Sequence, residues 1–445
     1  MPYLLDLCYF ALLLVFSPWL VYQGLRKGKY REGFSAKFLG RVPVRSCDEP
    51  CLWFHAVSVG EVNLLAPLLA QIRRHRPHWQ CVVSTTTMTG FALAQKKYAD
   101  LMVFYCPLDF SWATRAAMRR VRPTWLVLVE LELWPNLIRA ARRQGASVAI
   151  VNGRLSQRSY RGYRRLRPLV ARLLRQVDLV AAQNEEYAQR FLALGAPADC
   201  VQVSGSMKFD GAQTNRRNPT TLALRELAGI VDSDVVFLAG STQEPEEALA
   251  LATFRALSLR FPQLRLILVP RHPDRFPAVA RLLEQSGLPW QRRSELKDSS
   301  PSQGERVERN QQPILLVDAV GELGAWWGAA HIAFVGGSLG KRGGQNMIEP
   351  AAYGAAVSFG PNTRNFRDVV AQLLAADAAV VVGDGDELTA WVGRCLEDRG
   401  YAESLGHRAQ ALVAAQLGAT GRTLELLGPL MDPEAGILPF SSAAA

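Results

Sequence analysis

The sequence predicts an α/β protein with two doubly wound parallel-sheet domains that face each other, preceded by an N-terminal membrane-anchor helix. Three observations lead to this prediction. The 445 residues suffice for two or three domains, short β-branched runs alternate with helical stretches, and this alternation restarts after a polar linker. With 49% hydrophobic and 20% charged residues, the composition excludes a disordered tail protein, a collagen-like fibre and a multi-span transporter.

The segment from Tyr3 to Tyr22 comes close to the ~20 apolar residues that cross a bilayer, although Asp6 and Pro18 interrupt it. No Lys or Arg precedes it and no small-residue cleavage site follows it, so a cleaved signal peptide fits poorly. Seven basic residues and one acid lie between residues 26 and 45, which favours a cytoplasmic body. We expect residues 1–25 to anchor the protein in the membrane; the alternative is a helix that lies in the interface, or packs on the body, without spanning.

The body then alternates strand and helix patterns, as βαβ units do. The first domain, residues 26–212, should hold seven strands: Cys51 to Val59, Cys81 to Thr87, Leu101 to Cys106, Thr124 to Glu130, Ser147 to Asn152, Leu179 to Gln183 and Val201 to Gly205. A polar linker runs from Gly211 to Pro219. The second domain, residues 213–430, should hold six strands: Asp234 to Gly240, Arg265 to Pro270, Ile314 to Asp318, Ile332 to Val335, Ala356 to Phe359 and Ala379 to Val382. We expect a polar insertion from Lys297 to Gln312 and a flexible tail over residues 431–445.

The net charge of +11 favours an anionic partner, which could be nucleic acid, a phosphorylated substrate or a membrane surface. The seven cysteines are scattered and odd in number, which predicts a reducing compartment and no disulfide framework. Cys47 and Cys51 form the single close pair, but no second Cys or His pair follows at zinc-site spacing. We therefore expect no metal site.

Ligands of open parallel sheets bind at the carboxyl ends of the strands, so function should lie in the loops there. In the first domain this edge should carry Glu61, Glu130, Glu132 and Lys208. Glu61 could be a general base or could simply cap the following helix, and either of the other two acids could be a buried structural carboxylate. Lys208 could stabilise a developing negative charge or be an ordinary hinge lysine.

An arginine-rich stretch runs from Arg158 to Arg175, with seven arginines and no acid. The bland interpretation is a solvated amphipathic helix. Interleaved apolar residues make it resemble a surface that meets anionic lipid: Tyr160, Tyr163, Leu166, Leu169 and Leu173. Nucleic acid is the rival partner, but no nucleic-acid-binding module accompanies the stretch, so we expect none.

The second domain carries several anion-binding patterns at its strand ends. Arg271 and His272 follow one strand, and the amides of Gly321, Glu322 and Leu323 open a helix. A glycine-rich turn between Gly336 and Gly344 resembles a phosphate cradle but matches no established motif, so it is weak evidence alone. Glu349 follows at a helix start, where a carboxylate can accept hydrogen bonds from ribose hydroxyls. The lone His331 is interpreted as structural.

Ten motifs, in order from about Leu20 to Leu430, closely resemble the 3-deoxy-D-manno-octulosonic acid (Kdo) transferases of lipid A assembly. They are WFHAVSVGE, VELELWPN, NGRLSQRS, AAQNEE, GSMKFD, GSTQEPEE, VPRHPDRF, GEL, FVGGSLGKRGGQNMIEP and GPNTRNF. The resemblance implies two facing Rossmann-like domains, the GT-B glycosyltransferase architecture, in an enzyme on the cytoplasmic face of the inner membrane. It also implies CMP-Kdo as donor, the acylated glucosamine disaccharide bisphosphate precursor of lipid A as acceptor, and no cofactor or metal.

Carried over by position, Glu61 matches the family's catalytic base, and Glu130 and Lys208 match its supporting catalytic positions. The positions that match those holding CMP are Pro270, Arg271, Gly321, Glu322, Leu323, Asn346, Met347, Ile348 and Glu349. Two positions depart from the family, which often has histidine where this chain has Gln243 and Gln345. We therefore assign neither glutamine a catalytic role.

Three other functions remain open at this point. A nucleotide-sugar epimerase or a dinucleotide-dependent oxidoreductase could use similar halves, although no early GxGxxG supports the oxidoreductase. A non-catalytic membrane-bound binding module would bind CMP without turnover. A nucleic-acid binder would show steeply salt-dependent affinity for duplex DNA.

Overall fold

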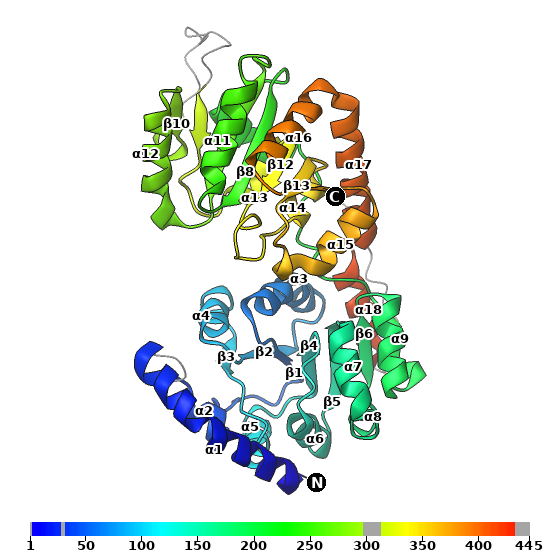
Figure 1. Ribbon diagram of the computed structural model, residues 1–445. Helices are drawn as coiled ribbons and strands as arrows, with labels where there is room; N and C mark the ends of the chain where they lie inside the picture. Colours follow the sequence, from blue (N-terminus) through cyan, green and yellow to red (C-terminus); the bar gives the residue numbers. More distant parts are fainter. Residues whose placement is uncertain (1, 28–31, 297–312, 432–445) are drawn as a thin grey trace. The chain divides into compact units, whose positions relative to one another are not determined.

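The computed structural model describes residues 2–27, 32–296 and 313–431. The predicted insertion and the predicted tail beyond Met431 lie outside these residues. The chain divides into two compact units, Met1–Gly211 with Leu417–Ala445 and Ala212–Gln416. Each unit is built around a parallel sheet, which confirms the predicted α/β class with two sheets (Figure 1).

The sheet of the first unit has seven parallel strands in the order β3-β2-β1-β4-β5-β6-β7. Each lies within or next to a segment predicted as a strand: β1 (Cys51–His55), β2 (Gln80–Thr85), β3 (Met102–Tyr105), β4 (Trp125–Val129), β5 (Ser147–Gly153), β6 (Leu179–Ala182) and β7 (Val201–Val203). The central strands β1 and β4 are buried on both faces, as expected for a sheet covered by helices on each side.

Side chains of these strands alternate between two cores, because neighbouring residues on a strand point to opposite faces. Trp53 and Leu126 belong to one core, and Phe54 and Val127 belong to the other. The helices of this unit are α1 (Pro2–Lys27), α2 (Phe34–Leu39), α3 (Val59–His75), α4 (Met88–Lys97), α5 (Ser111–Val121), α6 (Pro135–Arg143), α7 (Gln157–Arg165), α8 (Arg167–Leu174), α9 (Glu185–Leu194) and α18 (Ala419–Met431).

The sheet of the second unit also has seven parallel strands, in the order β10-β11-β9-β8-β12-β13-β14. They are β8 (Val235–Thr242), β9 (Leu264–Pro270), β10 (Trp290–Arg292), β11 (Ile314–Leu316), β12 (Ile332–Val335), β13 (Ala356–Phe359) and β14 (Val380–Val381). The sequence did not predict β10, a three-residue edge strand whose residues are all half-buried and show no alternation. The helices are α10 (Pro219–Leu227), α11 (Glu246–Leu257), α12 (Phe276–Ser286), α13 (Leu323–Trp326), α14 (Ile348–Ala352), α15 (Arg367–Ala375), α16 (Gly385–Glu397) and α17 (Arg399–Gln416).

Each sheet has one switch point in its strand order. The chain first adds strands toward one edge of the sheet, then returns to the middle and adds the remaining strands toward the other edge. In the first unit this switch point lies between the neighbouring strands β1 and β4, and in the second between β8 and β12. Ligands of open parallel sheets bind at the carboxyl edge beside such a switch point.

Helix α18 belongs to the first unit, whereas the sequence expectation extended the second domain to residue 430. Leu424, Leu427 and Met431 lie in the same core as Phe54. The Asp210 carboxylate accepts hydrogen bonds from the first backbone N–H groups of this helical segment, among them Gly418 N at 2.7 Å. The chain therefore returns to its first unit after α17 (Figure 1).

Helix α1 forms over the segment expected to anchor the protein, but no helix among the described residues is long and apolar enough to cross a membrane. The expectation of a spanning anchor is corrected accordingly. Asp6 is buried, and its carboxylate accepts hydrogen bonds from Ser111 N at 2.8 Å and Ser111 Oγ at 2.6 Å. Tyr9 donates a hydrogen bond to Asp109 at 3.1 Å. These polar contacts hold one face of α1 on the first unit, where it runs beside α5 (Figure 1).

Candidate active site

Glu61 lies in the first turn of α3, directly beyond β1. Ser58 is the N-cap, and its Oγ accepts a hydrogen bond from Glu61 N at 3.4 Å. The Glu61 carboxylate reaches back to accept hydrogen bonds from Ser58 Oγ at 2.8 Å and from Val57 N at 2.7 Å. Glu61 therefore caps its helix, as the bland interpretation expected, in the arrangement of a capping box.

The same carboxyl group also has a raised pKa. Burial raises the pKa of Glu61 to about 7, the hydrogen bonds from Val57 and Ser58 lower it, and repulsion from Glu130 and Glu132 raises it. A carboxyl group with a pKa near neutrality is suited to act as a general base. The cap positions the carboxylate, while burial has the largest effect on its proton affinity.

Glu130 follows β4 and adopts a left-handed backbone conformation, with φ of 61°, which is strained for a residue with a side chain. Its carboxylate Oε1 lies 3.0 Å from Lys208 Nζ, in a partly buried ion pair. Glu132 Oε2 accepts a hydrogen bond from Trp134 Nε1 at 2.8 Å, and burial raises the pKa of Glu132. The structure thus brings Glu61, Glu130 and Lys208 to one edge of one sheet.

Asn152, at the end of β5, holds the segment that carries Lys208, and the sequence analysis assigned it no role. It is fully buried with φ of 53°, and its Oδ1 accepts a hydrogen bond from Met207 N at 3.1 Å. Its own carbonyl accepts one from Gln183 Nε2 at 3.0 Å. The sequence did contain a pointer to these two residues, because Asn152 is the first residue of the motif NGRLSQRS and Gln183 lies in the motif AAQNEE.

The arginine-rich stretch forms two short helices, α7 and α8, rather than one. Tyr160 and Tyr163 pack against the core of the first unit and Leu173 is buried. Only Leu166 and Leu169 of the five interleaved residues are exposed, so most of the expected lipid-facing surface is instead turned inward.

In the second unit, Arg271 follows the end of β9 at Pro270, and its N–H donates to Thr242 O at 3.0 Å. Glu349 at the start of α14 accepts a hydrogen bond from Asn346 Nδ2 at 2.9 Å. Burial raises the pKa of Glu349, while hydrogen bonds from Asn346 and Trp327 and the charge of Arg271 lower it. Arg271, Asn346 and Glu349 therefore form one electrostatic group.

The predicted residues around this group contribute in different ways. Met347 and Ile348 are buried, so their side chains pack into the unit. Gly321 has φ of 97°, and the Glu322 carboxylate accepts hydrogen bonds from Arg293 Nε at 3.0 Å and Trp326 Nε1 at 3.1 Å. Leu323 begins α13, which has only four residues.

The glycine-rich turn after β12 already holds an anion from the protein itself. The Glu246 carboxylate is almost fully buried and accepts hydrogen bonds from Gly337 N at 2.7 Å, Ser338 N at 2.9 Å and Leu339 N at 3.0 Å. Gln243 N donates a fourth, at 2.9 Å. These amides are therefore not free to cradle a phosphate, which corrects the weak sequence signal.

Two other expectations concern histidine and metal. Burial lowers the pKa of His331 to about 4, and its Nδ1 accepts a hydrogen bond from Val236 N at 3.0 Å, as expected for a structural residue. In the part of the chain that the structure describes, no cluster of three His, Cys, Asp or Glu residues could hold a metal ion.

Comparison with known proteins identifies a family. The family model for "3-Deoxy-D-manno-octulosonic-acid transferase (kdotransferase)" matches residues 30–211. A 3-deoxy-D-manno-octulosonic acid transferase of Bordetella pertussis is 34% identical over 421 residues, covering 92% of this chain and 94% of the relative. One of Haemophilus influenzae is 32% identical over 432 residues, covering 96% of both. A solved structure of a putative UDP-N-acetylglucosamine 2-epimerase from Listeria monocytogenes shares the fold, with a TM-score of 0.54 and 12% identity over 88% of this chain and all of that one.

Proposed function

Because the chain belongs to the Kdo transferase family and is thus a glycosyltransferase, we propose that it transfers Kdo from CMP-Kdo to the acylated glucosamine disaccharide bisphosphate precursor of lipid A. The observation that carries this proposal is the group at the β1–β4 switch point. There a partly buried carboxyl group with a pKa of about 7 lies near two further carboxylates, one of which is paired with a lysine.

Glu61 is the proposed general base. Its carboxylate takes the proton of the acceptor's sugar hydroxyl as that oxygen attacks the anomeric carbon of Kdo from the face opposite CMP. The new C–O bond forms while the bond between the anomeric carbon and the phosphate oxygen breaks, and CMP leaves with the electron pair. Attack opposite the leaving group inverts the anomeric centre. No cofactor or metal enters this proposal.

Lys208 and Arg271 supply the proposed positive charge. Lys208 neutralises Glu130 at 3.0 Å, which limits the repulsion that Glu61 meets when it ionises. In the second unit Arg271 would stabilise the phosphate of CMP, and Glu349 would accept hydrogen bonds from its ribose hydroxyls. Asn346 and Trp327 hold Glu349 in place for that contact.

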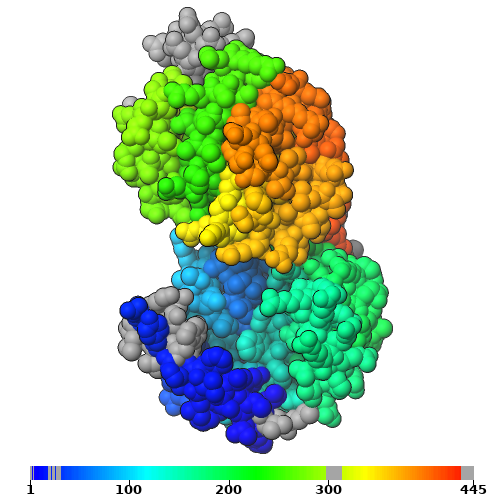
Figure 2. Space-filling model, in the orientation of Figure 1, coloured from blue at the N-terminus to red at the C-terminus, as the bar shows by residue number. Residues whose placement is uncertain are grey.

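We further propose that the protein works at the cytoplasmic surface of the inner membrane, with α1 lying in the interface. Beside the face that carries Asp6 and Tyr9, α1 exposes apolar side chains, with Leu7 65%, Phe10 55% and Leu14 62% accessible. In Figure 2 the first part of the chain, in dark blue, lies on the outside of its unit. The net charge of +11 would add attraction to anionic lipid.

The test of the reaction is incubation of purified protein with CMP-Kdo, generated in place, and the bisphosphorylated lipid A precursor. Mass analysis should show added Kdo, and Glu61→Ala should abolish it while CMP binding persists. Glu387→Gln is a matched control, because Glu387 caps α16 in the same way, with its carboxylate accepting from Gly383 N at 2.7 Å. Absence of product from wild-type protein that binds CMP would overturn the proposal.

A further inference from the structure

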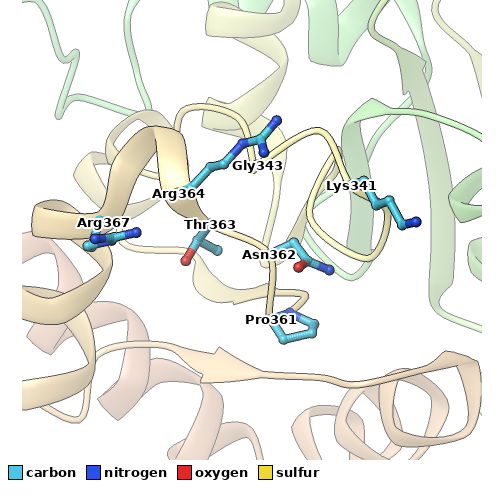
Figure 3. Close-up of a pocket in the computed structure, with 7 residues that line it drawn as sticks. All are labelled: Lys341, Gly343, Pro361, Asn362, Thr363, Arg364 and Arg367. Atoms are coloured by element: carbon cyan, nitrogen blue, oxygen red, sulfur yellow. The ribbon is translucent and has the colours of Figure 1, made fainter.

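A cavity of about 350 Å³ lies in the second unit between the glycine-rich loop after β12 and the loop after β13. Seven residues line it, and none of them is among the positions assigned to CMP (Figure 3). Three of the seven are cations, Lys341, Arg364 and Arg367, and none is an acid. We call this cavity the basic pocket.

Hydrogen bonds join the two loops that form the basic pocket. Asn365 Nδ2 donates to Arg342 O at 3.0 Å and to Gly344 O at 3.1 Å, and Asn362 Nδ2 donates to Leu339 O at 3.1 Å. Gly343 has φ of 98°, and a Cβ there would lie 2.5 Å from Arg364 Cγ. The two loops can approach this closely only with glycine at position 343, so the pocket is a defined feature of the fold.

The three cations lack the acidic partners that other arginines of this unit have. Arg275, for example, donates to both carboxylate oxygens of Glu247, at 3.0 Å each. Among the described residues, no carboxylate forms an ion pair with Lys341, Arg364 or Arg367. Figure 3 shows these side chains on different sides of the hollow, from the glycine-rich loop, the β13 loop and the start of α15.

The start of α15 forms part of the pocket wall. Arg367 is its first residue, no side chain caps the helix at Phe366, and the first turn also contains one acid, Asp368. Asp368 is not among the residues that line the pocket, so the positive potential of the pocket comes from Lys341, Arg364 and Arg367.

We propose that the basic pocket binds one anionic oxyacid group of a substrate. It deepens the proposed function, which supplies two sources of such a group: a phosphate of the acceptor disaccharide and the carboxylate of the donor sugar. Arg364 and Arg367 would donate charge-assisted hydrogen bonds to its oxygens, and Lys341 would add a third positive charge. The pocket is thus a specificity site, separate in its residues from Arg271 and Glu349.

The kinetic test compares Arg364→Gln and Arg367→Gln with Arg281→Gln, which removes an exposed arginine of α12. Each pocket variant should raise the KM of one substrate about tenfold with kcat nearly unchanged, and leave the Kd of CMP unchanged. If the acceptor phosphate is the ligand, the effect vanishes with an acceptor that lacks that phosphate. If the donor carboxylate is the ligand, the KM of CMP-Kdo rises instead.

Arg364→Lys checks that the effect follows charge, and it should restore most of the lost affinity. Two results would overturn the proposal: KM values within twofold of those of Arg281→Gln, or a loss of CMP affinity as large as the loss for CMP-Kdo. The second result would assign the pocket to the nucleotide.

A binding test separates failure of this inference from failure of the proposed function. With the proposed CMP position at Arg271 saturated by CMP, inorganic phosphate should bind wild-type protein and Arg281→Gln, and this binding should be lost in the Arg364→Gln/Arg367→Gln double variant. If the protein transfers no Kdo but shows this pattern, the proposed reaction fails and the anion site stands. If it transfers Kdo but phosphate binds all three proteins alike, the inference fails and the reaction stands.

Discussion

Each of the two sheets has a glutamate in the first turn of the helix that follows the strand at its switch point, but the two glutamates differ in their hydrogen-bond partners. Glu61 lies in the first turn of the helix after β1, and Glu246 is the first residue of the helix after β8, each beside the switch point of its sheet. Glu61 accepts two hydrogen bonds, from Val57 and Ser58, and keeps a pKa near 7. Glu246 accepts four, all from backbone amides, and three of these come from the glycine-rich turn.

This difference lies in how the two carboxyl groups are held. Four backbone amides donate hydrogen bonds to the Glu246 carboxylate, which ties two loops together. Glu61 has one amide and one hydroxyl as donors, and burial, followed by repulsion from Glu130 and Glu132, raises its pKa. The surroundings of each carboxyl group, rather than the residue type, therefore separate the structural Glu246 from the proposed general base.

The largest expected effect is on turnover in Glu61→Gln. Removing the base should lower kcat by about 10²–10⁴-fold. Stability should not fall at pH 8, because a carboxyl group whose folded pKa lies above its unfolded value opposes folding increasingly as the pH rises from about 4.5 to about 7. Measurements of kcat and of thermal unfolding test this, with Glu387→Gln as the control. A Glu61→Gln protein with normal turnover would contradict the proposal that Glu61 is the general base and that Glu246 differs from it in role.

The corresponding substitution in the second unit, Glu246→Gln, should lower the free energy of unfolding. It replaces an acceptor oxygen by a donor and leaves at least one buried amide of Gly337, Ser338 or Leu339 unpaired, at a cost of about 2–4 kcal/mol. Urea unfolding measures this loss. Glu244→Gln, in an exposed ion pair with Arg275, should change stability by only about 0.5 kcal/mol. Equal free energies of unfolding for the two variants would show that the four hydrogen bonds of Glu246 contribute little to stability.

A smaller effect concerns the pH dependence of the reaction. Glu61 must be ionised to act as a base, so kcat/KM should rise with pH through about 7. Glu130→Gln removes a repelling charge and should move this rise to lower pH by roughly one unit, whereas Lys208→Met leaves Glu130 uncompensated and should move it upward. Rate profiles from pH 5 to 9 check both; shifts of the same sign would contradict the assignment of Glu61 as the titrating group.

The smallest effect tests the cap of α3. Ser58→Ala removes one donor to the Glu61 carboxylate and should cost about 1 kcal/mol of stability while moving the pH profile upward by less than about one unit. Asp384→Ala removes the equivalent N-cap of α16 and should have the same stability cost with no change in the profile. An unchanged pH profile in Ser58→Ala would mean that the Ser58 hydroxyl stabilises the helix but does not affect the pKa of Glu61.

Much of this arrangement was predictable from the sequence. Strands such as β4 are short apolar runs that end in polar residues, and the ends of parallel strands meet at one edge, so Glu61, Glu130 and Lys208 could be placed together in advance. Asn152 lies in a recognisable motif, but its supporting role could not be read from the sequence, because its hydrogen bond to Met207 joins residues 55 positions apart. Packing of α1 on the body was the alternative expectation, and the contact that decides it joins Asp6 and Ser111, which are 105 positions apart.

The sequence by itself determined the two parallel sheets, the strand-end residues and the family, because these depend on local hydrophobic periodicity and on ordered motifs. Only the tertiary structure decided that the pKa of Glu61 is raised, which loop amides are already occupied, and that α18 returns to the first unit. The physical reason is that burial and hydrogen-bond donors come from segments far apart in the chain. Glu246 and its three glycine-loop amides are separated by 91 to 93 residues, and no local pattern records that they meet.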